Sequence, residues 1–320
     1  MTGTQQTPPS RGAGWLACGM AMVAWLGLAA VPAPAWAAGG PLEAVAVQGA
    51  QVLPARLGLA PGGPRLREVS GLAWDAPRGL WWTVSDRGLL VGWQVDFVPG
   101  RLEAQARVAL PLEGQPNAES VEMLPAADAG RPADLAVLDE AGARWWRFDV
   151  QGRALASTPL PAAAGLDYRR GVEALVRHPQ QGLVVVPQRP AKGAAAAGGP
   201  GGHTLVAEGG GRWTLAAAGR GASIKAAHAD AGGRLLLLEK VADAPLERRW
   251  WLRELDLGAC DRQGRCEAPA IPLASPALAE DDNLEGLACR DDGHCLAVSD
   301  DGRLPRPRTL LLWLQLRRGR

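Results

Sequence analysis

Long apolar runs are missing from most of this 320-residue sequence. After position 31, no uncharged apolar stretch reaches the roughly 20 residues that a membrane-spanning helix needs. A surplus of charge of either sign is missing too, because 34 basic residues face 33 acidic ones and the formal net charge is +1. This balance gives no reason to expect nucleic acid or a membrane surface as a partner.

Common catalytic signatures are also missing. No serine lies in a G-x-S-x-G motif, so the sequence does not predict an α/β-hydrolase. There is no Walker loop and no dinucleotide fingerprint, and the Gly-rich stretch at 193–202 has neither the lysine nor the flanking helix of a phosphate-binding loop. Lysine itself is scarce, with three copies against 31 arginines, which indicates a GC-rich bacterial genome rather than a chemical requirement.

The first 37 residues have the pattern of an export signal. A polar leader with one arginine (1–11) precedes an uncharged apolar run (14–31), and Ala35-Trp36-Ala37 supplies the small-x-small pattern that signal peptidase reads. The alternative is an uncleaved membrane anchor, for which the run is a little short. We predict a signal peptide at 1–37 and a mature domain at 38–320. The mature protein would be periplasmic or secreted, in a bacterium, and would not contact the membrane.

Four cysteines follow the predicted signal, in two pairs whose members are six residues apart. Each pair brackets a turn, DRQGR in the first and RDDGH in the second. Residues at this spacing can face each other across a hairpin within disulfide reach, and an even count in an exported chain favours disulfides. A zinc site is the alternative, but the spacing and the lack of convergent histidines argue against it. The predicted disulfides join Cys260 to Cys266 and Cys289 to Cys295.

One pattern recurs about every fifty residues, and it is clearest in DDNLEGLACRDDGHCLAVSDDG at 281–302. Each copy has a leading polar residue, an apolar run, a turn, a second apolar run and a trailing polar residue. The other copies lie at 69–88, 118–142, 172–190 and 224–240. The leading residues are Ser70, Glu119, Glu173, Lys225 and Glu285. The trailing residues are Asp86, Asp139, Gln188, Glu239 and Asp300.

Each copy is followed by the pattern of a third strand and usually by that of a fourth. Helical periodicity is weak outside the signal. Sets of four short strands at a period of about 50 to 60 residues are typical of a β-propeller. We therefore expect an all-β protein with five four-stranded blades, in which the N-terminal segment 44–57 completes the last blade and closes the ring. A degenerate sixth blade and a β-sandwich stay open as alternatives.

The repeat also predicts where its polar residues lie. In a propeller blade the first strand runs along the central channel and the second strand returns, so the start of the first and the end of the second lie at the same face. We therefore expect the leading and trailing residues of all five copies to surround one mouth of the channel.

Several of these motifs resemble the phytase-like family, which is described as "esterase-like activity of phytase". They are EVSGLAWD with WWTVSDRG, AESVEML, GVEAL, LLLLEK, and DNLEGLA with LAVSDD, in this order over roughly 67–302. The resemblance implies an exported bacterial propeller, and the family description implies hydrolysis of ester or phosphoester bonds. Lys225 departs from the acidic residue expected at the leading position, so a metal site that needs a carboxylate from this copy would lack it.

Carboxylates around one mouth repel one another unless a cation, basic side chains or raised pKa values relieve them. Hard oxygen donors of the kind that Ca²⁺ prefers are available, and the predicted ligands are Glu119, Glu173, Asn283, Glu285 and Asp300. The hypothesis is that Ca²⁺ polarises a phosphoryl or acyl oxygen while a carboxylate activates water. The predicted catalytic residues are Glu285, Glu173 and Asp300. A small anionic ligand would be held by Arg87, Lys225 and Lys240.

Two other interpretations stay open. The acidic residues can act purely as salt bridges and strand-end hydrogen bonds that fix one blade against the next. The propeller can also bind a ligand or a protein without any catalysis. The sequence gives no indication of the oligomeric state.

Overall fold

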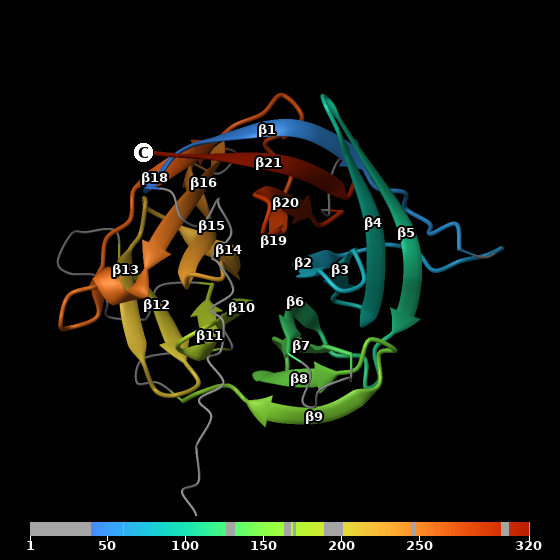
Figure 1. The fold of residues 1–320 in the computed structure, drawn as a ribbon, viewed down its shortest axis with the longest axis horizontal. Helices are drawn as coiled ribbons and strands as arrows, with labels where there is room; N and C mark the ends of the chain where they lie inside the picture. The colour runs from blue at the N-terminus through green and yellow to red at the C-terminus, as the bar shows by residue number, and fades with distance from the viewer. Residues whose placement is uncertain are drawn as a thin grey trace, which may run out of the picture. The chain divides into compact units, whose positions relative to one another are not determined.

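Five small sheets stand around a common centre (Figure 1). The computed structural model describes residues 40–59, 61–125, 132–162, 168, 171–188, 201–244, 247–301 and 307–319, all within one compact unit. The predicted all-β propeller is confirmed, and the described residues form five blades rather than six. No helix in these ranges is long and apolar enough to cross a bilayer. The predicted signal at 1–37 and its cleavage site lie outside the described residues.

The blades follow the order of the chain. Blade 1 contains β2 (Val69–Asp75), β3 (Leu80–Ser85), β4 (Leu89–Val98) and β5 (Arg101–Pro111). Blade 2 contains β6 (Ala118–Leu124), β7 (Asp134–Asp139), β8 (Arg144–Phe148) and β9 (Ala154–Pro159). Blade 3 contains β10 (Val172–His178), β11 (Gly182–Pro187), β12 (Gly202–Ala207) and β13 (Arg212–Ala216). Blade 4 contains β14 (Ser223–Ala229), β15 (Arg234–Ala244), β16 (Glu247–Asp256) and β18 (Ala270–Leu273).

Blade 5 joins the two ends of the domain. Its inner strands are β19 (Leu284–Cys289), β20 (His294–Ser299) and β21 (Leu310–Arg318), and its outer strand is β1 (Leu42–Val52). β1 pairs antiparallel with β21 along nearly its whole length (Figure 1). The closure predicted from 44–57 is thus confirmed, and it covers an edge of β21 that would otherwise be open to pairing.

The core lies between the blades. Trp82 and Ala73 of blade 1 pack with Val121 and Leu135 of blade 2, and similar apolar clusters fill the other interfaces. The innermost strands β2, β6, β10, β14 and β19 each contact the next one around the ring, and β19 contacts β2. Burial of these apolar faces stabilises the ring and fixes the positions of the five inner strands.

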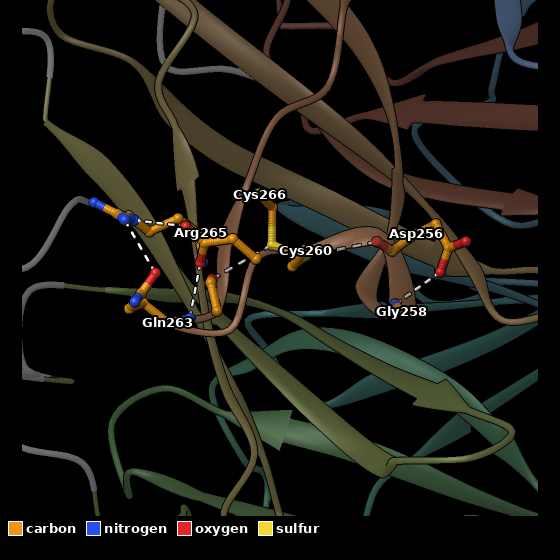
Figure 2. The surroundings of a disulfide bond; sticks show 8 residues. Asp256, Gly258, Cys260, Gln263, Arg265 and Cys266 are labelled. Carbon is orange, nitrogen blue, oxygen red and sulfur yellow. Dashed lines mark hydrogen bonds and ion pairs between the residues drawn. A yellow bond between two sulfur atoms is a disulfide. The ribbon is translucent and has the colours of Figure 1, made fainter.

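Both predicted disulfides are present. Cys289 and Cys295 are cross-strand partners on β19 and β20. Cys260 and Cys266 close a loop that follows β16, and Figure 2 shows this disulfide next to the turn in which the Asp256 carboxylate accepts a hydrogen bond from the Gly258 N–H. The end of the loop, β17 (Arg265–Cys266), pairs parallel with β13. The loop therefore links blade 4 to the outer edge of blade 3.

Candidate functional site

The inner strands carry a β-bulge at the leading polar residue. The pairing with the second strand shifts at Glu119, Glu173, Lys225 and Glu285, so none of these four has a cross-strand partner, and in blade 1 the shift comes just after Ser70. A bulge changes the direction of the extra side chain. This local irregularity allows the leading residues to face the centre of the ring instead of the interfaces between blades.

Four of the five leading residues contact one another. The Lys225 Nζ lies 2.7 Å from Glu173 Oε1 and 3.0 Å from Glu285 Oε1. The Ser70 hydroxyl donates a hydrogen bond to Glu285 Oε2 at 3.1 Å. These residues come from blades 1, 3, 4 and 5, so the predicted convergence of distant residues at one mouth is confirmed.

Small residues form the floor beneath this ring, because each leading residue is followed by glycine, serine or alanine. A Cβ on Gly71 would lie 2.6 Å from the Val121 nitrogen, and a Cβ on Gly286 would lie 2.8 Å from the Gly71 carbonyl carbon. The Ser120 hydroxyl accepts a hydrogen bond from the Leu175 N–H at 3.2 Å. Neighbouring inner strands are therefore in direct contact here.

Three of the five predicted trailing residues join the mouth. Asp86 Oδ1 lies 3.1 Å from Ser70 Oγ, so the Ser70 hydroxyl shares its single proton between Asp86 and Glu285. The Gln188 amide donates to Glu173 Oε1. The Asn283 amide donates to Glu285 at 2.6 Å and to Asp300 at 3.3 Å.

The prediction is wrong for the other two trailing residues, Asp139 and Glu239, because it is out of register by one residue. The Asp139 carboxylate accepts a hydrogen bond from Trp146 Nε1 at 3.2 Å, away from the ring. Glu239 is fully buried between blades 3 and 4, where it contacts His203 Nε2 at 2.7 Å and Arg253 at 3.0 Å. Within the described residues, neither carboxylate forms a hydrogen bond or an ion pair with a leading residue of the mouth.

The trailing residues that lie at the mouth in blades 2 and 4 are Glu140 and Lys240, each one position after the predicted residue. Asn117 Nδ2 donates to Glu140 Oε2 at 3.3 Å, and Lys240 Nζ donates to Asn283 Oδ1 at 2.8 Å. The sequence did contain a signal for the second of these. The leader and the trailer are 15 or 16 residues apart in blades 1, 3 and 5, and a trailer at position 240 restores that spacing in blade 4.

Arg87 lies on the exposed rim of the mouth. Its guanidinium pairs with the Glu68 carboxylate, and 68% of the Arg87 side chain is exposed. Glu68 has a positive φ of 49°, and its N–H donates to Asp301 Oδ1 at 2.8 Å. A non-glycine residue in this conformation is uncommon and marks a place where the surroundings hold the backbone tightly. The predicted role of Arg87 in holding an anion stays a prediction.

Burial and mutual repulsion raise the pKa values of several carboxyl groups in the mouth. Burial, followed by the charges of Asp86, Glu173 and Glu285, raises the pKa of Glu119 to about 10. Burial and the nearby Glu285 raise the pKa of Asp86 to about 6. Burial also raises the pKa of Glu173 to about 7, although the Lys225 ammonium acts in the opposite direction.

Lys225 remains charged in this environment. Burial alone would lower the pKa of its ammonium, but Glu285 and Glu173 outweigh this effect and raise the pKa above its ordinary value. Glu119 differs from the other leading residues, because within the described ranges no side chain forms a hydrogen bond or an ion pair with its carboxyl group.

A cleft of about 580 Å³ opens at the seam between blades 5 and 1. Its walls include the acidic residues Glu68, Asp86, Asp300 and Asp301 and the basic residues Arg65, Arg67 and Arg308. Asp86 belongs both to this cleft and to the hydrogen-bond network of the mouth. A molecule in the cleft can therefore reach the mouth at Asp86.

Three of the predicted calcium ligands, Glu173, Glu285 and Asp300, already accept hydrogen bonds from neighbouring side chains. Glu285 accepts from Ser70, Asn283 and Lys225, and Glu173 accepts from Lys225 and Gln188. In the described part of the chain, no group of three or more His, Cys, Asp or Glu side chains is arranged to hold a metal ion. These contacts do not fit Ca²⁺. The ion stays a prediction, and no step below depends on it.

The fold and the mouth define a five-bladed propeller with a polar, partly buried cluster at one end of its axis. The sequence matches the phytase-like family, described as "esterase-like activity of phytase", over residues 64–302. This range is well over half of the chain, and the chain belongs to that family.

No curated protein matches this sequence. Among solved structures it is similar to a virginiamycin B lyase from Staphylococcus aureus, with 12% identity, a TM-score of 0.37, and coverage of 77% of this chain and 66% of that one. It is also similar to a luciferin-regenerating enzyme (8% identity, TM-score 0.41, 80% of this chain and 94% of that one) and to a glucose dehydrogenase (13%, 0.40, 85% and 99%). The alignment spans slightly less than two thirds of the lyase. At these TM-scores the similarities carry no argument about function.

Proposed function

We propose that the mouth is an acid–base site that hydrolyses ester or phosphoester bonds. The observation that carries the proposal is the position of Asp86, which lines the cleft and is hydrogen-bonded to Ser70 inside the mouth that also holds Glu119. Burial raises the pKa of Asp86 to about 6 and that of Glu119 to about 10. Between these values Asp86 is ionised and Glu119 is protonated, and a base and an acid acting together need these two states. The family description names the same class of reaction.

The two carboxyl groups would have complementary roles. Asp86 is half-buried and lines the cleft, so it would take a proton from the water that attacks the acyl or phosphoryl centre. Ser70 orients Asp86 through its hydrogen bond. Glu119 would give its proton to the leaving oxygen. Each such transfer typically contributes a factor of about 100 or more to the rate.

The acids that the sequence predicted as catalytic receive different roles. Glu173 and Glu285 are 4% and 9% exposed and are bonded to Lys225, so we propose that they position this lysine instead of contacting the substrate. Asp300 lines the cleft and keeps a proposed role in contacting the substrate.

The cleft suits a small substrate with an anionic end. Arg65 and Arg67 both line the cleft, on either side of the buried Leu66. Their guanidinium groups can bind a carboxylate or phosphate oxygen. The two disulfides are typical of a protein in an oxidising compartment, and we propose that the protein acts in the periplasm or outside the cell.

The test is turnover of aryl esters and aryl phosphates over a range of pH. We expect kcat/KM to rise through about pH 6, as Asp86 ionises, and to fall near pH 10, as Glu119 loses its proton. Asp86→Asn and Glu119→Gln should each lower kcat about 100-fold, whereas Glu103→Gln, on the exposed outer strand of blade 1, should have no effect. Turnover that is absent on both substrate classes, or unchanged in both variants, contradicts the proposal.

A non-catalytic binding propeller is the second candidate. The observation that favours it is the network through Ser70, Glu285, Asn283 and Lys240, which joins blades 1, 4 and 5 and has a structural purpose of its own. In that case a ligand of the cleft would bind Asp86→Asn as tightly as the unchanged protein, and neither would turn over any ester.

A further inference from the structure

We infer that Lys225 is the resident cation of the mouth and takes the place that a divalent metal ion would need. Its ammonium lies 2.7 Å from Glu173 of blade 3 and 3.0 Å from Glu285 of blade 5. Lys225 belongs to blade 4, between these two, and only 4% of it is exposed. The inference concerns the charge at the mouth and holds whether or not the mouth is catalytic.

The choice of lysine at this position is informative. The chain has 31 arginines and three lysines. Two of the lysines, Lys225 and Lys240, lie at the mouth, and the third, Lys192, lies outside the described residues. Arginine has a wide planar head, whereas an ammonium is a compact charge with three donors, which suits a narrow gap between two carboxylates. Lysine therefore replaces the otherwise preferred arginine at the position where a compact cation fits.

Lys225 and a metal ion exclude each other at this place. Calcium takes roughly six to eight oxygen ligands at about 2.3 to 2.6 Å. An ion that used Glu173 and Glu285 together would stand close to the ammonium, with strong repulsion between the two positive charges. The lysine thus supplies a positive charge that is fixed by folding and does not depend on the concentration of free calcium.

The experiment measures Ca²⁺ binding to the purified protein by calorimetry and by thermal unfolding, with and without chelator. We expect the unchanged protein to bind no Ca²⁺ at the mouth and to keep its Tm in chelator. Lys225→Met should expose the carboxylates to the ion and bind one Ca²⁺, which raises its Tm by roughly 5 °C at saturation. Lys240→Met is the matched control, because Lys240 is also at the mouth but bonds the Asn283 amide oxygen. This variant should gain no Ca²⁺ site.

Two results would overturn the inference. One is a folded Lys225→Met protein that binds no Ca²⁺. The other is an unchanged protein that binds one Ca²⁺ and loses it in Glu285→Gln. If Lys225→Met folds only when Ca²⁺ is present, the inference is supported. If it folds under neither condition, the measurement on the unchanged protein decides, since chelator-resistant stability without bound ion supports the inference and a Glu285-dependent ion refutes it. The readouts are binding and Tm, so a failure here is distinct from a lack of turnover.

Discussion

The two halves of the mouth handle the same crowding of acids in different ways. In the half formed by blades 3, 4 and 5, Lys225 lies between Glu173 and Glu285, and Lys240 bonds Asn283 next to Asp300. In the half formed by blades 1 and 2, no ion pair among the described residues reaches the carboxyl groups, which belong to Asp86, Glu119 and Glu140.

This difference separates two physical solutions. In the first half, Lys225 compensates the charge of Glu173 and Glu285, and these two acids hold its ammonium in place. Among the described residues the second half has no such cation. There Glu119 relieves the repulsion by holding its proton, because burial and the neighbouring acids raise its pKa to about 10. Chemistry that moves protons is therefore expected in the second half, and structural stability in the first.

Removal of the Lys225 charge should lower the free energy of unfolding more than any other change considered. Lys225→Met leaves Glu173 and Glu285 buried without a counter-ion, and loss of one partner from a buried pair costs about 3 to 5 kcal/mol. Urea unfolding at about pH 7.5 measures the change. Neutral substitutions at all three positions together should recover most of the loss. If the free energy of unfolding of Lys225→Met lies within about 1 kcal/mol of that of the unchanged protein, lysine does not compensate the acids of the first half.

The floor below the second half should be the next most sensitive place. Gly71 and Gly79 both have φ of +64°, but a Cβ on Gly71 meets the backbone of blade 2, whereas a Cβ on Gly79 meets nothing within 4 Å. Gly79→Ala should cost about 1 kcal/mol for its backbone conformation alone, and Gly71→Ala about 3 kcal/mol because the blades must also move apart. Equal costs in urea unfolding would show that the inner strands are not in close contact there.

The smallest of the three effects is a pH dependence of stability. The pKa values of Asp86, Glu119 and Glu173 are raised in the folded state, so their contribution is complete below the unfolded values near pH 4 and is lost as the pH rises. We expect the free energy of unfolding to fall between about pH 5 and pH 8. Glu119→Gln should restore on the order of 2 kcal/mol at pH 8 and change little near pH 4.

The control for this prediction is Glu103→Gln, which replaces an exposed acid. Its pH profile should follow that of the unchanged protein. A Glu119→Gln profile that keeps the full slope would show that Glu119 does not hold its proton at neutral pH, and it would also remove the basis for its role as an acid.

The parts of the mouth that follow from strand order were predictable, because a repeat of fixed length places its equivalent positions around one axis. Ser70, Glu119, Glu173, Lys225 and Glu285 were found in this way. Side-chain direction near a bulge was not predictable, since a slip of one residue moves a side chain to the other face. Asp139 and Glu239 were misassigned for that reason.

The protonation of Glu119 was also beyond the reach of sequence. It depends on how far the neighbouring carboxyl groups and the solvent are from it, and these distances are set by the packing of all five blades. Pairing of cysteines six residues apart, in contrast, depends on a local turn, and the predicted pairing is correct both in the β19–β20 hairpin and in the loop after β16.

The pairing of β1 with β21 has a consequence for biosynthesis. β1 is the first strand of the propeller along the chain and β21 is the last, so blade 5 cannot be completed before the last strand is available. Until β21 is available, β1 has no strand to pair with, and the ring of blades is not closed. Assembly of the ring is therefore timed by the arrival of a single late strand.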